Sequence, residues 1–517
     1  MCGDRSRGAS MIGTASASGS EAGFRREYLG TDAGSDPAAC HSTIRILGIP
    51  GELRYGRVRG DWCAEPAPCN HVDLQMRPDG VELFASLSPA PLRARKNTER
   101  KNRLGFIVPS FIIALFFVLA YVEFSSSGYA EFSLYATIST YFWVCLFGTL
   151  IPAVTFLSLR RRHAPGVERA SALPFISIVI PAFNEERKIC QAIDAALKQD
   201  YPLFEVIVVD DGSRDFTRFV AECYRVRLIH QRSNQGKFAA LNRGIAEARG
   251  EIIVTSDSDS MLDPDALKYL AHHFDDPLVG AVAGAIRPMN CRGLVRRLQC
   301  IEYVWGQEIL KLAQSGSGAS VTLCPGPVTA FRRATLDDIG GFKGRTVTED
   351  FDATLDAIAA GWKVIFEPRA KSLTDTPANW AELMRQRQRW SLGALQTFLQ
   401  HRALLCNRSA GLVSAFWLPW FVFSSYVTLA LDLAMVGLIL PFVVFGPTAA
   451  LLAKGAVFGL IIELVVVVQY QIGLVAAGER RPSFYAAAFL MKPLTVLLAW
   501  TRLRAVYLTL ARRDTAW

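Results

Sequence analysis

Two aspartates one residue apart, Asp257 and Asp259, follow an apolar run that reads Ile-Ile-Val-Thr-Ser. Such a pair at the end of a strand can share Mg²⁺ or Mn²⁺, which prefers oxygen ligands and keeps positions open for substrate phosphates. The cation would neutralise charge on a departing diphosphate. On this motif alone, a polar turn before a helix is an open alternative.

Polar side chains also follow two earlier apolar runs, Phe175–Ile180 and Phe204–Val209. They are predicted to bind a nucleoside, because carboxylates there can accept hydrogen bonds from a uracil imide and a ribose. A simple strand-to-helix turn with a helix cap is the alternative for the second group. The candidates are Asn184 and Glu185 after the first run, and Asp210 and Asp211 after the second.

Lys237 follows Gly236 at the start of a predicted helix. A lysine at a helix N-terminus suits a phosphate, because the helix dipole and the ammonium act together there. Farther along, Glu349 and Asp350 follow Thr348 at the start of another predicted helix. Asp350 is the candidate general base that takes the proton of an attacking hydroxyl. The alternative is that these acids only complement the helix dipole.

A basic and aromatic segment, Gln386-Arg387-Gln388-Arg389-Trp390, precedes the last apolar part of the chain. A tryptophan face can stack on a sugar ring, and arginine can bind diphosphate oxygens in a fork. Gln386, Arg389 and Trp390 are therefore candidates for an acceptor and diphosphate clamp. Taken alone, the segment also fits an ordinary helix at a membrane surface.

Short β-rich runs alternate with helical ones from Phe175 to Thr255. This alternation predicts an α/β domain with a largely parallel sheet covered by helices. Ligands bind at the carboxyl ends of such strands, where Asp210, Asp211 and Asp257 fall.

The chain of 517 residues is 51% hydrophobic, with a mean hydropathy of +0.22. The stretch 104–124 has one charged residue and 132–159 has none, and each exceeds the roughly 20 residues that span hydrocarbon. They predict a transmembrane hairpin. Three further passages are expected at about 411–440, 449–478 and 483–501, with a re-entrant last segment around Pro493 or a fourth span as open alternatives.

Basic residues flank the predicted hairpin on both sides, which places both of its ends in the cytoplasm by the positive-inside rule. The net charge of +9 is explained by these clusters near anionic lipid, and no nucleic-acid-binding module is recognisable. The eleven cysteines contain no CxxC pair, and cytosolic placement argues against disulfides. The predicted parts are a disordered extension over 1–92, the hairpin over 93–163, the α/β domain over 172–385, interfacial helices over 386–410 and a membrane region over 411–517.

The ordered motifs Asp-Asp-Gly-Ser, Asp-Ser-Asp, Thr-Glu-Asp and Gln-x-x-Arg-Trp, with membrane segments on both sides, resemble the family 2 processive glycosyltransferases. The resemblance implies a GT-A fold, a Rossmann-like nucleotide-sugar-binding domain inserted between transmembrane helices, with Mg²⁺ or Mn²⁺ as cofactor. It implies uridine contacts at Asn184, Glu185, Asp210 and Asp211, phosphate contacts at Lys237 and Asp257, metal ligands at Asp257 and Asp259, the base at Asp350, and an acceptor and diphosphate clamp of Glu349, Gln386, Arg389 and Trp390.

The expected activity is polymerisation of a β-linked polysaccharide from a UDP-sugar, with UDP-N-acetylglucosamine as the expected donor. The alternatives are a single transfer to a lipid, as in ceramide glucosyltransferase-like proteins, a β-glucan or hyaluronan synthase, and a membrane scaffold whose site has decayed. The expected partners are the donor, a growing polysaccharide or lipid acceptor, the bilayer and accessory export proteins. The expected location is a bacterial inner membrane, with the catalytic domain in the cytoplasm.

Overall fold

The structure, a computed structural model, describes residues 46–49, 52–55, 148, 152–153, 173–405, 407, 410–427, 429 and 449–511. The chain divides into two units at residues 98 and 99. In the first unit, β1 (Ile46–Ile49) and β2 (Glu52–Tyr55) form an antiparallel pair. The rest of the predicted N-terminal extension and nearly all of the predicted hairpin lie outside the described residues.

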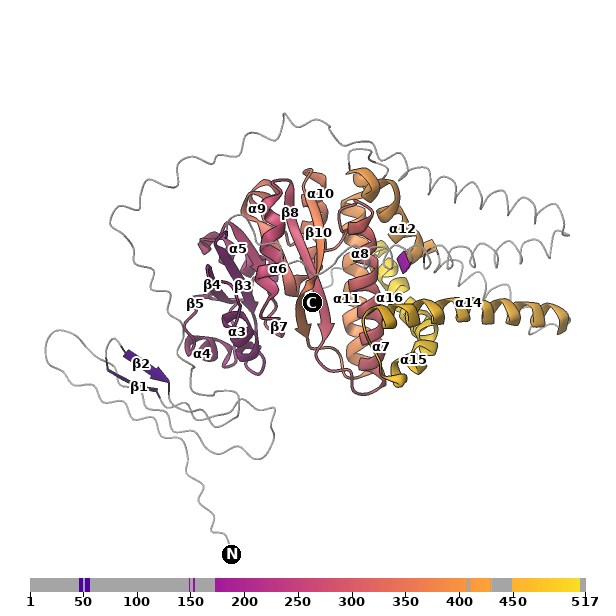
Figure 1. Ribbon diagram of the computed structural model, residues 1–517, viewed down its shortest axis with the longest axis horizontal. Coiled ribbons are helices and arrows are strands. Elements are labelled where there is room, and N and C mark those ends of the chain that lie inside the picture. Colours follow the sequence, from indigo (N-terminus) through magenta and orange to yellow (C-terminus); the bar gives the residue numbers. More distant parts are fainter. Residues whose placement is uncertain are drawn as a thin grey trace, which may run out of the picture. The chain divides into compact units, whose positions relative to one another are not determined.

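The second unit contains an eight-stranded sheet in the order β5-β4-β3-β6-β9-β8-β10-β7 (Figure 1). Its strands are β3 (Ile176–Ala182), β4 (Phe204–Asp210), β5 (Arg227–His230), β6 (Ile252–Thr255), β7 (Ser260–Leu262), β8 (Val279–Pro288), β9 (Thr329–Arg332) and β10 (Lys363–Thr374). The first four strands of this order are parallel, as predicted. However, β9 runs antiparallel between β6 and β8, and β7 runs antiparallel to β10, so the sheet is mixed.

Alternate residues of the central strands face opposite sides, so each strand contributes to two hydrophobic clusters. On β3, Ile178 and Ile180 face one cluster while Val179 faces the other, and all three are fully buried. The first side is covered by α3 (Ile189–Leu197), α4 (Thr217–Glu222) and α6 (Ala266–Ala271); the second by α5 (Lys237–Glu247), α9 (Arg333–Ile339) and α10 (Glu349–Ala359). Each fully buried aliphatic side chain contributes about 1.5 to 3 kcal/mol to folding.

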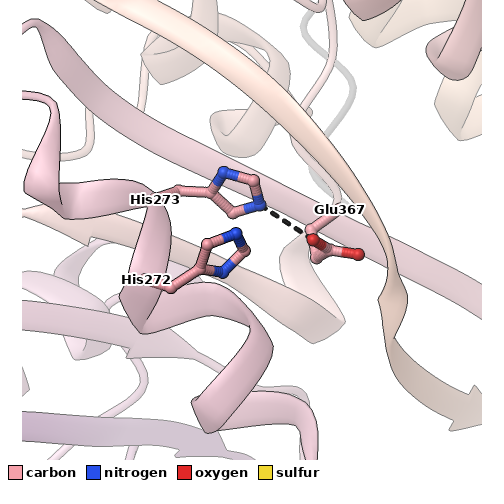
Figure 2. A group of neighbouring side chains, drawn as sticks. All are labelled: His272, His273 and Glu367. Atoms are coloured by element: carbon pink, nitrogen blue, oxygen red, sulfur yellow. Dashed lines mark hydrogen bonds and ion pairs between the residues drawn. The ribbon is translucent and has the colours of Figure 1, made fainter. Parts of the chain in front are cut away.

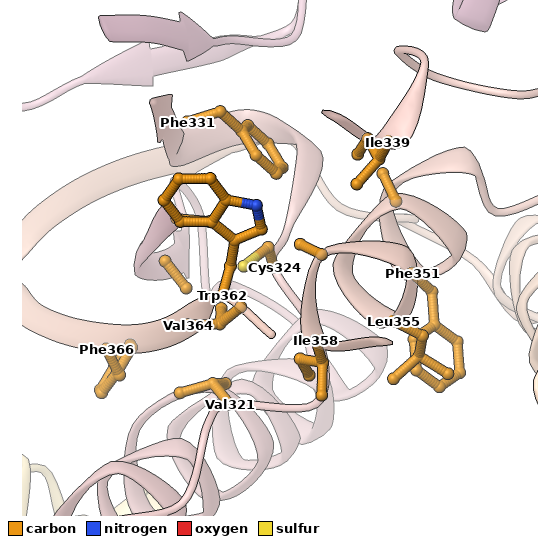
Figure 3. Packing of buried hydrophobic residues seen from close by; sticks show 14 of the residues in the cluster. Val321, Cys324, Phe331, Ile339, Phe351, Leu355, Ile358, Trp362, Val364 and Phe366 are labelled. Atoms are coloured by element: carbon orange, nitrogen blue, oxygen red, sulfur yellow. The ribbon is translucent and has the colours of Figure 1, made fainter. Parts of the chain in front are cut away.

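Trp362, next to β10, is a buried member of the cluster on the second side. Figure 3 shows Trp362 near Phe331 of β9, with Leu355 and Ile358 of α10 lining the same cluster. The indole nitrogen of Trp362 donates a hydrogen bond to Asp338 (3.1 Å). This packing holds α10, whose first residues belong to the candidate site, firmly against the sheet.

The remaining helices are grouped beside the sheet (Figure 1). They are α7 (Leu294–Tyr303), η3 (Val304–Ile309), α8 (Leu310–Gly316), α11 (Trp380–Gln400), α12 (Leu418–Val422), α14 (Ala449–Ala476), α15 (Pro482–Ala487) and α16 (Met491–Leu510). Because α11 is continuous through residue 385, the predicted boundary between 385 and 386 falls inside a helix. Helix α16 packs along α11, and Ser391 shares a hydrogen bond with Thr501 (3.0 Å).

Among the described residues, one helical stretch, Pro482–Leu510, is long and apolar enough to cross a membrane, and it is partly buried in the protein. The apolar stretch Glu463–Ala476 is shorter. Pro493 lies in the first turn of α16, where proline is tolerated, so it does not interrupt that helix. The structure also joins Cys291 to Cys300 in a disulfide, against the prediction that cysteines stay reduced. Cys291 lies in the loop before α7 and Cys300 within α7, and this spacing gave no sequence signal for the pairing.

Candidate active site

The ends of β3 and β4 lie side by side, because Ala182 is in register with Asp210. Asp210 is fully buried, accepts a hydrogen bond from the backbone N–H of Ser213 (3.1 Å) and pairs with His230 (2.8 Å). Asp211 accepts hydrogen bonds from the backbone N–H groups of Gln235 (2.8 Å) and Gly236 (2.9 Å). The two predicted nucleoside ligands therefore also fix the loop that leads into α5.

The turn after β3 carries Asn184 and Glu185. Asn184 has a left-handed backbone (φ 55°), and its side-chain oxygen accepts a hydrogen bond from the N–H of Arg214 (2.9 Å). Burial raises the pKa of Glu185 to about 7; Lys188 opposes this rise, while Asp259 and Asp257 add to it. Glu185, which was predicted among the nucleoside contacts, thus also interacts electrostatically with Asp257 and Asp259.

Lys237, at the first residue of α5, links two of the predicted motifs. Its ammonium lies 2.7 Å from Oδ1 of Asp257 and 3.2 Å from Oε1 of Glu349. Burial lowers the pKa of this ammonium, but Asp257, Glu349 and Asp350 together raise it above its ordinary value. Lys237 is therefore charged and lies among the carboxylates that follow β6 and those that begin α10.

The backbone of Gly326 lies close to this cluster. Its N–H donates a hydrogen bond to Oδ2 of Asp350 (3.2 Å). A Cβ at this position would lie 2.8 Å from Nζ of Lys237 and 3.2 Å from Oδ1 of Asp257. Only a glycine leaves this space open, so the backbone at Gly326 can reach the candidate base.

Asp350 has the properties of a base held out of water. Burial and the neighbouring Glu349 raise its pKa to about 6, against the opposing effect of Lys237. A carboxylate with such a pKa is ionised at neutral pH and is a stronger proton acceptor than an ordinary aspartate. The predicted role of Asp350 is therefore chemically consistent with its surroundings.

Asp257 and Asp259 offer a donor set suited to a hard divalent cation. Burial raises the pKa of Asp259, and repulsion from Asp257 raises it further. Lys188 and Lys237 offset only part of this repulsion, and a bound cation would offset more of it. Two aspartates are few ligands, which fits a cation completed by substrate phosphates.

The clamp segment lies on α11. The rings of Trp390 and Tyr303 are 6.5 Å apart, and burial raises the pKa of Tyr303 to about 12, with Asp259 among the carboxylates that add to the rise. The guanidinium over the Trp390 ring, at 4.1 Å, belongs to Arg387, which is 5% exposed and pairs with Glu302. The predicted Arg389 is exposed instead.

Gln386 accepts a hydrogen bond from Arg387 (2.6 Å), so its side chain lies beside the arginine that packs on Trp390. The clamp prediction thus named the outward arginine of the segment and not Arg387, which packs on the tryptophan. Tyr303 and Lys188 were not among the predicted residues; Lys188 pairs with Asp375 (3.1 Å) beside Asp259. No spacing rule could have found them, since each comes from an element outside the four motifs.

Two other histidine and carboxylate groups in the described part of the chain could in principle hold a metal ion. Figure 2 shows the first, in which His273 pairs with Glu367 (2.8 Å) beside His272. Arg369 donates two further hydrogen bonds to the same carboxylate, at 2.9 and 2.8 Å. The second contains Asp352, Asp356 and His401 and is likewise held by an arginine, Arg345. Arg369 pairs with the one carboxylate of the first group, and Arg345 and Lys343 pair with the two carboxylates of the second, so both groups are ion-pair networks.

The mixed sheet, with one antiparallel strand inserted and carboxylates at the ends of its parallel strands, has the architecture of a GT-A fold. Residues 177–340 match the family described as Glycosyl transferase family 2. This part of the chain is therefore similar to family 2 glycosyltransferases, which confirms the resemblance inferred from the motifs.

Several curated proteins are similar to this chain. A poly-beta-1,6-N-acetyl-D-glucosamine synthase of Staphylococcus epidermidis is 30% identical over 230 residues, which cover 44% of this chain and 56% of that protein. The synthase of the same name from Staphylococcus aureus strain COL is 29% identical over 250 residues, covering 47% and 59%. A protein named "Probable glycosyltransferase YdaM" of Bacillus subtilis is 30% identical over 252 residues, covering 46% and 59%. The match thus spans less than two thirds of each relative.

A solved structure supports the fold. The mannosyltransferase PcManGT from Pyrobaculum calidifontis, in complex with GDP-Man and Mn²⁺, superposes with a TM-score of 0.52 at 21% identity and covers 71% of this chain and 99% of its own. This likeness confirms the GT-A fold.

Proposed function

We propose that the protein is a membrane-bound, inverting hexosyltransferase that polymerises a β-linked polysaccharide from a UDP-sugar, with UDP-N-acetylglucosamine as the donor. The observation that carries this proposal is the position of Lys237, whose ammonium bridges Asp257 and Glu349 next to Asp350. It brings a phosphate-binding charge, a metal-binding carboxylate and a base into one site. The names of the staphylococcal relatives support the choice of donor and product.

The transfer step uses Asp350 as the base. Its carboxylate removes the proton from the acceptor hydroxyl while that oxygen attacks the anomeric carbon of the donor. The new bond joins the acceptor oxygen to that carbon, and the bond from the carbon to the diphosphate oxygen breaks with its electron pair leaving on UDP. Attack from the side opposite the leaving group inverts the anomeric centre.

The other residues orient the two substrates. Asp210, Asp211 and Asn184 lie at the strand ends where the nucleoside would bind, and Lys237 carries the charge that opposes the diphosphate. Trp390, beside Tyr303, offers a ring face on which the acceptor sugar can stack. Gln386 and the exposed Arg389 complete the proposed clamp.

Mg²⁺ or Mn²⁺ would be held by Asp257 and Asp259 and would supply charge neutralisation for the departing UDP. The raised pKa of Asp259 and its repulsion from Asp257 support this assignment. The PcManGT structure, a complex with GDP-Man and Mn²⁺, supports a divalent cation in this fold.

The membrane part of the proposal uses the apolar segments. Helix α16 lies within an apolar stretch of sufficient length and packs on α11, which carries the clamp. With the basic residues that flank the predicted hairpin, this favours a catalytic domain on the cytoplasmic side of a bacterial inner membrane. A polymer leaving the clamp would then enter the bilayer region directly, with accessory export proteins as partners.

The test uses the purified full chain in lipid vesicles with Mg²⁺ and a panel of UDP-sugars, followed by mass spectrometry of the products. The proposal predicts UDP release and a ladder of N-acetylhexosamine units from UDP-N-acetylglucosamine. One sugar on an organic-soluble lipid would support the single-transfer alternative instead. Absence of UDP release with every donor would reject the transferase activity.

A further inference from the structure

Helix α11 carries one continuous stripe of residues that reaches from the clamp to its own C-terminal end. Gln386, Trp390, Gly393, Thr397 and His401 follow one another at intervals of three or four residues, so they lie on the same face of the helix. The stripe begins with the proposed acceptor clamp. Its other members contact the segment that begins α10, where Asp350 lies.

The middle of the stripe is in close contact with that segment. A Cβ at Gly393 would lie 2.4 Å from Cγ2 of Thr348, so only glycine permits this approach. The hydroxyls of Thr397 and Thr348 are 3.4 Å apart, and the side chain of Gln396 accepts a hydrogen bond from the N–H of Val347 (3.1 Å). The two helices are therefore fixed to each other within three residues of the candidate base.

The far end of the stripe is anchored by a buried charge network. Nε2 of His401 lies 2.8 Å from Oδ1 of Asp352, and these residues are only 8% and 1% exposed. Arg345 donates to both oxygens of Asp352, at 2.8 and 3.0 Å, and also pairs with Asp356 (2.8 Å). The network joins the end of α11, the first turns of α10 and the loop before α10.

Asp352 lies two residues after Asp350, in the first turn of the same helix. A side chain that holds Asp352 therefore fixes the position of the base as well. Asp350 itself receives only backbone donors from Gly326 and Phe351 among the hydrogen bonds of the described residues. Its orientation relative to the clamp thus depends on how α10 is held against α11.

We infer that His401 is a positioning residue for sugar transfer: through Asp352 it sets the distance between the base Asp350 and the acceptor clamp on α11. This inference rests on the proposed function. The residues proposed to bind the donor nucleoside lie at and just after the ends of β3 and β4, outside the contact between α10 and α11. Loss of His401 should therefore affect turnover and acceptor use but not donor binding, because small displacements of reacting groups cost about 10²-fold in rate.

The test compares four variants of the full chain in lipid with the wild type. His401→Leu removes the polar contact, while His401→Gln keeps an N–H near the position of Nε2. Gly393→Ala disturbs the same helix contact without changing charge. His273→Leu is the matched control, since this histidine also pairs with a buried carboxylate, Glu367, but lies outside the stripe.

The expected result is a fall in kcat of about 10- to 100-fold for His401→Leu and Gly393→Ala, with the dissociation constant of the UDP-sugar within about twofold of wild type. His401→Gln should recover most of the rate, and His273→Leu should retain it. If His401→Leu fails to fold, the kcat of Gly393→Ala tests the inference instead.

Three outcomes would overturn the inference: wild-type kcat in His401→Leu or Gly393→Ala, no recovery in His401→Gln, or an equal loss in His273→Leu. An inactive wild type would instead reject the proposed function, and this inference with it.

Discussion

The Nζ of Lys237 lies 2.7 Å from Oδ1 of Asp257, although the two residues belong to different motifs separated by a helix and a strand. The same ammonium reaches Glu349 from a third motif (3.2 Å). In the proposed function, this ammonium and the two carboxylates contact the bound substrate together. It makes the three motifs parts of one site, and each of the following predictions tests one part of that site.

The first prediction concerns the base. Asp350→Asn keeps the shape of the side chain but cannot accept a proton, so transfer should fall by about 10²- to 10⁴-fold. Incorporation of labelled sugar into product measures the rate, and UDP-sugar binding should persist. Asp337→Asn, which alters an exposed carboxylate, is the control and should leave the rate unchanged. Wild-type incorporation in Asp350→Asn would remove Asp350 from the mechanism.

The second prediction concerns pH. Since burial and Glu349 raise the pKa of Asp350 to about 6, the base is protonated and inactive below that pH and ionised above it. The rate kcat/KM should therefore rise through about pH 6 and level off at higher pH. Glu349→Gln removes a repelling charge, which lowers the pKa of Asp350 and should move the rise to lower pH. A rise that stays in place would assign it to another group.

The third prediction concerns the cation. Removal of divalent ions by a chelator should abolish UDP release, and added Mg²⁺ or Mn²⁺ should restore it. Asp259→Asn should reduce the rate by about 10²-fold or more at saturating metal. The reason is that a bound cation stabilises the charge on the leaving diphosphate in the transition state by several kcal/mol. A titration of rate against metal concentration gives the apparent affinity. Full activity in the chelator would exclude a metal-dependent reaction.

The fourth prediction concerns the close approach of Gly326. Gly326→Ala places a methyl group 2.8 Å from Nζ of Lys237, which must then move away from Asp257. Transfer should fall by about 10-fold or more, while the melting temperature changes little because the lysine end is flexible. Gly306→Ala is the matched control, since its added Cβ meets nothing within 4 Å. Equal rates in the two variants would show that transfer does not require the close approach of Gly326 to Lys237.

The fifth prediction concerns the acceptor. Trp390→Ala should raise the acceptor KM by about 5- to 10-fold, the loss expected for one stacking contact of about 1 kcal/mol. Slow hydrolysis of the donor by water should continue. Trp380→Ala removes another tryptophan of α11 that is 41% exposed, and it should have no such effect. An unchanged acceptor KM in Trp390→Ala would place the acceptor elsewhere.

Much of this site could be predicted from the sequence, because apolar runs indicate the strands and the turn residues that follow them indicate where each strand ends. Asp210, Asp211 and Asp257 follow apolar runs, and parallel strands bring such ends to one edge. The antiparallel insertion of β9 could not be predicted, since nothing in its four residues indicates which strands it pairs with or in which direction it runs relative to them. For the same reason the contact between Gly326 and Asp350 was not foreseen.

Side-chain direction on a helix was the other limit. Arg387 and Arg389 both belong to the clamp segment, and only the packing of α11 shows that Arg387 faces inward over Trp390. Likewise, Cys291 and Cys300 come together because of the path of the loop before α7, which no local pattern specifies. These contacts depend on tertiary packing, which the local spacing of residues in a sequence does not reveal.

The central claim is that the separated acidic motifs form one nucleotide-sugar site. A cryo-electron microscopy structure of the full chain in lipid with UDP and Mn²⁺ tests it most directly. The account predicts the uridine at Asp210 and Asp211, the cation at Asp257 and Asp259, and the diphosphate within reach of Lys237, with Asp350 and Trp390 facing the same space. UDP bound away from these strand ends, or a cation held by other residues, would contradict it.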